Sequence, residues 1–158
     1  MAENLLIGGN TKAEMYATLI PQIESLVATE TDLVANMANV AACLKQTFNF
    51  WWVGFYRTEG NELVLGPFQG PLACTRIKKG RAVCGTAWAE CRTVIVPNVD
   101  LFDGHIACSS ASKSEIVVPI YCGREVVGVL DVDSEHFDSF DEDDRQGLEK
   151  IVEILVCK

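Results

Sequence analysis

Two runs of apolar residues, separated by a very short turn, constrain the fold of this chain more than any other feature. Residues 115–121 (EIVVPIY) and 125–133 (EVVGVLDVD) are rich in β-branched side chains, and Cys122-Gly123 lies in the gap between them. Such runs on either side of a short, glycine-containing connection predict an antiparallel β-hairpin. Residues 116–118 are all apolar, which indicates a strand buried in the core.

Helical patterns occur at both ends of the chain. Apolar residues recur at helical spacing in 15–27, where Pro21 predicts either a kink or a helix start, and in 33–48, after a cap at Thr31-Asp32. A last helix opens at Asp141 and has acidic residues in its first turn, where the helix dipole favours them. The apolar faces are Met15, Leu19, Ile23 and Val27; Leu33, Met37, Val40, Leu44 and Phe48; and Leu148, Ile151, Val152 and Leu155.

The middle of the chain alternates short strands with loops. We predict strands at 50–56, 62–65, 73–77 and 93–96, a loop at 66–71 and a short helix from Cys84 to about Cys91. About six short strands with helices at both ends predict an α+β domain, with the helices packed against a mainly antiparallel sheet. The 158 residues suffice for one domain, so we expect a flexible tail at 1–11 and a single domain at 12–158.

Charge and hydropathy exclude several classes of partner. The chain has 22 acidic and 13 basic residues, a net charge of -9, and such a surface repels the phosphates of nucleic acids. No apolar run approaches the roughly 20 residues that span a bilayer. The first ten residues lack the basic and apolar segments of a secretion signal. We therefore expect a cytoplasmic protein with no nucleic-acid or membrane partner.

The seven cysteines are many for a cytoplasmic domain. Their odd number and the reducing compartment argue against a static disulfide framework. The chain has no Cys-x-x-Cys pair, and the spacings Cys74–Cys84, Cys84–Cys91 and His105–Cys108 match no common zinc site, so we expect no bound metal. Thiol redox chemistry is the functional alternative to buried, inert thiols.

Residues 97–114 form a long segment with few periodic signals, and uncommitted loops of this length are usually lids or binding loops. Cys108 lies inside it, among serines whose hydroxyl and N–H groups would favour a thiolate. Cys74 and Cys84 could resolve an oxidised Cys108. The alternative is that Cys108 is a small hydrophobe that fills a gap, and His105 either tunes this thiol or only holds the loop.

Acidic and aromatic side chains near the predicted hairpin are candidates for a binding site. Glu115 either hydrogen-bonds the loop backbone or acts on a ligand, and partial burial would raise its pKa and suit it to proton donation. Asp131 and Asp133 alternate with a valine, so both point to one face of their strand and could bind an ammonium group, unless this strand end is exposed. Trp52 and Tyr56 belong either to the core or to a wall that holds a methyl, sulfur or cationic group.

Three longer segments carry a resemblance to a known family. Residues 66–87 (GPFQGPLACTRIKKGRAVCGTA), 102–120 (FDGHIACSSASKSEIVVPI) and 126–134 (VVGVLDVDS) closely resemble the free methionine-(R)-sulfoxide reductases, single-domain enzymes of the GAF fold. With WVGFY at 52–56, the likeness extends over residues 12–156. It implies a GAF-like six-stranded antiparallel sheet with packed helices, usually in a homodimer. It also implies reduction of free L-methionine (R)-S-oxide without a bound cofactor, with electrons from thioredoxin, NADPH and thioredoxin reductase.

The family's functional pattern falls on eight residues of this chain. These are Cys108 as nucleophile, Cys74 as resolving thiol, Cys84 as secondary or alternative resolving thiol, Glu115, Asp131 and Asp133 in the substrate pocket, and Trp52 and Tyr56 as its aromatic wall. Glu115 would hydrogen-bond or protonate the sulfoxide oxygen. The other four cysteines match no role in the family, and we interpret Cys43, Cys91, Cys122 and Cys157 as structural.

Two positions depart from the family's pattern. Ala82 stands where a glycine is usual, and Ser109 stands where an aspartate often follows the nucleophile. Neither change removes a reacting group, but the first could stiffen the loop before Cys84 and the second could alter the pKa of the nucleophile. Two alternative functions remain open from sequence: a non-catalytic GAF domain that senses a small molecule, and a thiol redox sensor.

Overall fold

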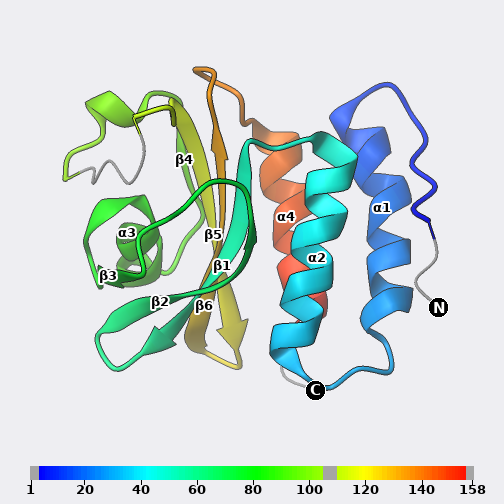
Figure 1. Ribbon diagram of the computed structural model, residues 1–158, viewed down its shortest axis with the longest axis horizontal. Helices are drawn as coiled ribbons and strands as arrows, with labels where there is room; N and C mark the ends of the chain where they lie inside the picture. The colour runs from blue at the N-terminus through cyan, green and yellow to red at the C-terminus, as the bar shows by residue number, and fades with distance from the viewer. Residues whose placement is uncertain (1–3, 105–109, 156–158) are drawn as a thin grey trace.

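The structure is a computed structural model that describes residues 4–104 and 110–155. One sheet separates two unequal groups of helices (Figure 1). In chain order the elements are α1 (Lys12–Val27), α2 (Leu33–Phe48), β1 (Trp52–Glu59), β2 (Glu62–Gln69), β3 (Arg76–Lys78), α3 (Ala82–Glu90), β4 (Val94–Val96), the 3-10 helix η1 (Val99–Leu101), β5 (Ser114–Cys122), β6 (Glu125–Ser134) and α4 (Glu142–Leu155). None of the helices described is long and apolar enough to cross a bilayer.

The six strands form one sheet in the order β3-β2-β1-β6-β5-β4, and every neighbouring pair is antiparallel. The predicted hairpin is confirmed as β5–β6, whose register runs from Ser114 opposite Ser134 to Cys122 opposite Glu125. Since residues 114–120 are all buried, this hairpin has both faces covered, as the apolar run at 116–118 indicated. The α+β class and the mainly antiparallel sheet are also confirmed.

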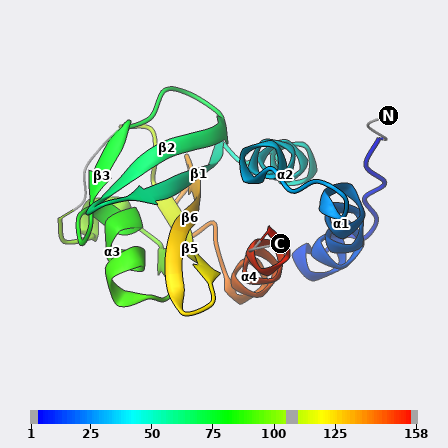
Figure 2. The ribbon, with the colours of Figure 1, turned by 90° about the horizontal axis from the view of Figure 1, so that it is seen from below.

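Three helices cover one face of the sheet and α3 covers the other (Figures 1 and 2). Helices α2 and α4 lie against the strands, and α1 packs on the outside of both. The N-termini of these helices are capped as the sequence predicted for two of them: the Asp32 carboxylate accepts from the Ala35 N–H, and Asp141 accepts from the N–H groups of Asp143 and Asp144. Pro21 lies inside α1, which begins nine residues earlier at Lys12 behind a capping box of Thr11 and Glu14.

The predicted end of β2 was wrong. The sequence Gly66-Pro67 suggested a loop, but β2 continues to Gln69. The register of β1 against β2 shifts between Gly54 and Tyr56, the part of β1 that faces Gly66-Pro67. Such an irregularity lets a proline, which has no N–H to donate, remain within a strand. The extension carries Phe68 to a position opposite Gly54.

The segment before α1 has no regular secondary structure in its described part, residues 4–10, yet it contacts α1. Leu6 donates its N–H to the Gln22 side chain at 2.9 Å and accepts from it at 2.9 Å. Leu5 and Ile7 pack against the helical core. The described part of the predicted tail therefore lies along the helical layer.

Close packing between α1 and α4 gives a first prediction. A Cβ added at Gly147 would lie 2.4 Å from two ring atoms of Tyr16, a buried side chain whose hydroxyl donates to Asp144. Gly147→Ala gains about 1 kcal/mol of helix propensity, but the clash outweighs it, and we expect a net loss of about 1–2 kcal/mol in the free energy of unfolding. Urea unfolding measures this change.

The matched control is Gly8→Ala, whose added Cβ would be 3.7 Å from its nearest neighbour, Thr18 Cγ2. It should leave the unfolding midpoint unchanged. A Gly147→Ala variant as stable as the parent chain would contradict the close packing of α1 on α4.

Candidate functional site

Three carboxylates meet on the face of the sheet that α3 covers. Asp131 and Asp133 both lie on β6, on one face as predicted, and Glu115 on β5 is paired with Asp133. On the other side of β6, β1 places Trp52 opposite Asp133 and Gly54 opposite Asp131. Because neighbours in register share a face of a sheet, acidic groups from two strands and an aromatic group from a third gather at one place.

Helix α3 adds a thiol to this cluster. Cys84 is buried and its Sγ lies 3.9 Å from Glu115 Oε1, at the limit of a sulfur hydrogen bond. The helix can approach this closely because the next residue is Gly85, whose added Cβ would be 2.4 Å from the Lys78 carbonyl oxygen. The residue after Cys84 therefore has to be small for the thiol to reach the carboxylates.

Burial controls the protonation of the carboxylates. Loss of water raises the pKa of Glu115 well above its usual value, and the charges of Asp131 and Asp133 raise it further. The pKa of Asp131 also lies well above its usual value, mainly because the side chain is buried and secondly because of the charge of Asp133. The pKa of Asp133 is raised to about 6, because the effect of burial exceeds the lowering effect of the hydrogen bond from Ser112. Burial and the neighbouring charges therefore favour the protonated form of Glu115, which can donate a proton.

One oxygen of the cluster has no partner. Asp131 is 6% exposed, and its Oδ1 makes no hydrogen bond. None of the ion pairs among residues 4–104 and 110–155 involves Glu115, Asp131 or Asp133. A buried carboxylate oxygen without a hydrogen-bond donor is costly, so the Asp131 Oδ1 position suits a ligand that brings positive charge or N–H donors.

The buried rings of Trp52 and Tyr56 form an aromatic wall beside the carboxylates. Their rings are stacked at 6.2 Å between centroids, and Trp52 also stacks on Phe68 at 5.4 Å. Trp52 Nε1 donates to the Pro71 carbonyl at 3.0 Å, and the Tyr56 hydroxyl donates to the Cys74 carbonyl at 2.9 Å. The wall therefore also holds the backbone of the segment that carries Cys74.

Sequence reasoning missed two residues of this site. Phe68 was placed in a loop, and its position opposite Gly54 in the β1–β2 register could have been found only by recognising the irregular pairing. Ser112 is one of the serines near Cys108 that we expected to favour a thiolate, but its hydroxyl donates to Asp133 Oδ1 at 2.7 Å. A serine facing a carboxylate from a different strand leaves no local sequence signal.

The cysteines differ in state. Cys74 is disulfide-bonded, and so is Cys122, for which no disulfide was expected. Among the described residues Cys43, Cys84 and Cys91 are free. The thiol of Cys84 has a pKa raised well above its usual value by burial and by the charges of Asp131 and Glu115.

Three residues of the sequence-based hypothesis, Cys108, His105 and Ser109, lie outside the described residues.

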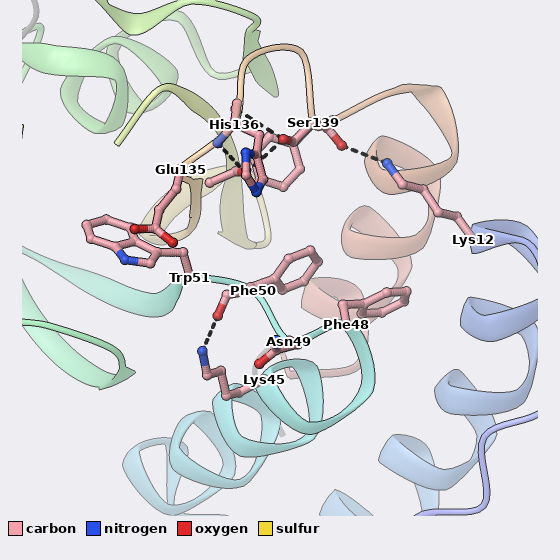
Figure 3. Close-up of a pocket in the computed structure, with 11 residues that line it drawn as sticks. Lys12, Lys45, Phe48, Asn49, Phe50, Trp51, Glu135, His136 and Ser139 are labelled. Carbon is pink, nitrogen blue, oxygen red and sulfur yellow. Dashed lines mark hydrogen bonds between the residues drawn. The ribbon is translucent and has the colours of Figure 1, made fainter. Parts of the chain in front are cut away.

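A cavity of about 500 Å³ lies elsewhere, between the C-terminal end of α2 and the β6–α4 connection (Figure 3). None of the predicted site residues lines it. Both lysines at its border already have partners, since Lys45 donates to the Phe50 carbonyl and Lys12 to the Ser139 carbonyl at 2.8 Å. Its cations are therefore not free to bind an anion.

The site can be compared with known proteins. Residues 27–155 match the GAF domain model. The chain is 58% identical to GAF domain-containing protein A of Dictyostelium discoideum, over 98% of this chain and 99% of that protein. It is 47% identical to the free methionine-R-sulfoxide reductase of Escherichia coli K12, over 89% of this chain and 86% of that enzyme.

A solved structure agrees with these relatives. The free methionine-R-sulfoxide reductase of Neisseria meningitidis, solved in complex with its substrate, superposes with a TM-score of 0.94 at 55% identity, over 96% of this chain and 92% of that one. The chain belongs to the free methionine-R-sulfoxide reductase family of GAF domains. The predicted family and the predicted GAF-like fold are thereby confirmed.

The departure at Ala82 from the usual sequence of this reductase family has a structural cost. Ala82 is the first residue of α3 and has a φ of +52°, in the left-handed region that favours glycine. An alanine there is strained by about 1–2 kcal/mol. The strain falls two residues before Cys84, in the turn that starts the helix.

The raised pKa of Asp133 predicts a pH-dependent effect on stability. A carboxyl whose folded pKa of about 6 exceeds its unfolded value stabilises the fold at low pH, and this contribution is lost as the pH rises from about 4 through 6. Asn does not titrate, so Asp133→Asn should gain stability relative to the parent chain, by up to about 2–3 kcal/mol, between pH 4 and pH 7. Urea unfolding at these two pH values measures the difference.

Asp103→Asn, at an exposed residue, is the control for the loss of one acidic side chain from the surface. If the difference between the Asp133→Asn variant and the parent chain were the same at both pH values, the buried environment of Asp133 would be refuted.

Proposed function

We propose that this chain reduces free L-methionine (R)-S-oxide to L-methionine, with a cysteine as nucleophile. The observation that carries the proposal is a cluster of three carboxylates, with Glu115 and Asp131 buried and Asp133 half-buried, beside an aromatic wall and a thiol-bearing helix. Within residues 4–104 and 110–155 none of the three forms an ion pair. The E. coli relative and the N. meningitidis structure are both named free methionine-R-sulfoxide reductases, and the latter holds its substrate. We further propose that residues 12–158 act as one catalytic domain.

The substrate's charged end accounts for the unpaired carboxylates. The α-ammonium group of free methionine sulfoxide would pair with Asp131 and Asp133, and it would supply the donor that Asp131 Oδ1 lacks. A residue within a peptide has an uncharged amide nitrogen at this position and would leave the carboxylates unpaired, which favours the free amino acid. Trp52 and Tyr56 would receive the S-methyl group.

The sulfoxide needs a nucleophile and an acid on one substrate. The Cys108 thiolate attacks the sulfur, and Glu115, held as a carboxylic acid by burial, hydrogen-bonds or protonates the oxygen as the S–O bond breaks. The protonated oxygen passes from the substrate sulfur to the Cys108 sulfur, and the bond between the two sulfurs breaks with its electron pair going to methionine, so Cys108 becomes a sulfenic acid. The oxygen of the substrate is then on the Cys108 sulfur.

Resolution of the sulfenic acid would use Cys74 in preference to Cys84. The Cys74 thiol displaces the sulfenic oxygen as water and forms a disulfide with Cys108, which thioredoxin then reduces by thiol exchange, with NADPH and thioredoxin reductase as the electron source. The disulfide-bonded state of Cys74 supports this assignment. Cys84 is free and its thiol is held protonated by burial and by neighbouring carboxylates, which disfavours it as an attacking group.

The same proposal includes a cytoplasmic location, where thioredoxin reduction operates, and a homodimeric assembly. It includes no bound cofactor and no metal as part of the catalytic cycle. The two sensor functions remain the rivals, because a GAF domain can bind a small molecule without chemistry.

A coupled assay distinguishes the enzyme from both rivals. NADPH consumption with thioredoxin, thioredoxin reductase and free methionine (R)-sulfoxide should require the chain, and the Cys108→Ser variant should reduce turnover to the uncatalysed level because the nucleophile is lost. Cys91→Ser, at an exposed free thiol, is the control and should keep full activity. Full activity of Cys108→Ser would end the assignment of the nucleophile.

Single-turnover experiments separate the two candidate resolving thiols. Cys74→Ser should still form about one methionine per chain, since only the later condensation is blocked, but it should not turn over with thioredoxin. Cys84→Ser should retain thioredoxin-dependent turnover. Normal steady-state rates for Cys74→Ser would show that Cys84 resolves the sulfenic acid alone.

A further inference from the structure

The carboxylate cluster and the thiol beside it have the ligand types of a metal site. No step of the proposed reaction uses a metal ion. One ligand atom each from Cys84, Glu115 and Asp131 lie within 4.8 Å of one another, and all three residues are buried. They come from α3, β5 and β6. The two strands are hydrogen-bonded neighbours and α3 covers them, so the three groups are held by the packed body of the protein.

The spacing is close to that of a tetrahedral centre. With zinc–sulfur and zinc–oxygen bonds of about 2.3 and 2.0 Å, the sulfur and oxygen ligands of one tetrahedral ion are roughly 3.5 Å apart. Cys84 Sγ and Glu115 Oε1 are 3.9 Å apart. A contraction of a few tenths of an ångström, within the freedom of the side chains, would bring both atoms to one ion.

An unpartnered oxygen is also available. Asp131 Oδ1 is buried without a hydrogen-bond partner, beside Cys84 and Glu115. With Asp133 next to them, the site offers three carboxyls and a thiol, and no lysine or arginine is paired with these carboxyls among the described residues. The single positive charge of a substrate ammonium neutralises only part of the charge that these groups can carry. A divalent cation neutralises more of it.

The ligand types select the class of ion. A thiolate favours zinc, cadmium and cobalt over the hard cations magnesium and calcium, which need six or more oxygen ligands or waters. A set of one sulfur and two carboxylate oxygens suits a four-coordinate ion whose fourth position is a water or a third oxygen donor.

We propose that Cys84, Glu115 and Asp131 bind a thiophilic divalent cation of the Zn²⁺ class, and that this ion excludes the substrate. The ion and the substrate ammonium require the same Asp131 carboxylate, so they compete for the site. The metal-binding part stands on the geometry alone, whereas the competition rests on the proposed function. The ion is an inhibitor, and it is bound by the resting, substrate-free enzyme.

Cobalt(II) is the probe, because a thiolate bound to it gives a near-ultraviolet charge-transfer band and a tetrahedral site gives strong visible bands. The titration uses the full chain carrying Cys74→Ser and Cys108→Ser, which removes the thiols proposed for the redox cycle. We expect one Co²⁺ per chain with both signatures, displaced by Zn²⁺. Adding Cys84→Ser should abolish the charge-transfer band, and adding Asp131→Asn should weaken binding by more than about tenfold.

Cys91→Ser in the same background is the matched control, since Cys91 is a free thiol at the other end of α3. It should leave the spectrum unchanged. A band that survives Cys84→Ser, or no cobalt binding at all, would overturn the metal site. Circular dichroism of each variant separates loss of a ligand from loss of the fold.

Competition is measured in the chain with all its cysteines, reduced and freed of metal by a chelator. Free methionine sulfoxide should weaken Zn²⁺ binding, and Zn²⁺ should raise the KM for the sulfoxide without changing kcat, reversibly with chelator. Zn²⁺ binding that is indifferent to substrate would refute the inhibition. Absence of turnover in the metal-free assay would instead refute the proposed function, and the cobalt spectrum would be unaffected by that result.

Discussion

The pairing of β5 with β6 is the constraint on which the rest of the molecule depends. Its register puts Glu115 beside Asp133, and the same hairpin forms the buried centre of the sheet, with helices packed on both faces. The burial of the hairpin's apolar side chains stabilises the fold, and this offsets the cost of removing the carboxyl groups from water. Their raised pKa values follow directly from this burial.

Periodicity predicted what depends on local sequence. The hairpin, the three long helices and the common face of Asp131 and Asp133 all follow from spacings of two or of three to four residues, and all agree with the structure. The continuation of β2 was missed because Pro67 usually ends a strand, and only the partner strand's irregular register tolerates it. The approach of Cys84 to Glu115 was missed for another reason: the two residues are 31 positions apart, and a glycine next to the thiol gives only an indirect sign of close packing.

Local sequence spacing also gives no sign of the proposed metal ligands. The cysteine spacings along the chain match no zinc motif, and for a site built from one loop or hairpin that reasoning is sound. Here the ligands come from a helix and two strands, one residue from each. Local spacing carries no information about such a set. Tertiary packing alone brings the sulfur atom of Cys84 to the oxygen atoms of Glu115 and Asp131, the carboxylates beside which the substrate ammonium is proposed to bind.

The hydrogen bonds of Trp52 and Tyr56 to the carbonyls of Pro71 and Cys74 have an evolutionary consequence. The side chains proposed to receive the methyl group also fix the backbone of Cys74, the proposed resolving cysteine. Enlarging the receptor for bulkier sulfoxides by trimming either ring would release that backbone at the same time. In the proposed mechanism, substrate range and regeneration of the catalytic cysteine therefore depend on the same two side chains. A lineage that broadened its substrate range by trimming them would need other contacts to hold the Cys74 segment.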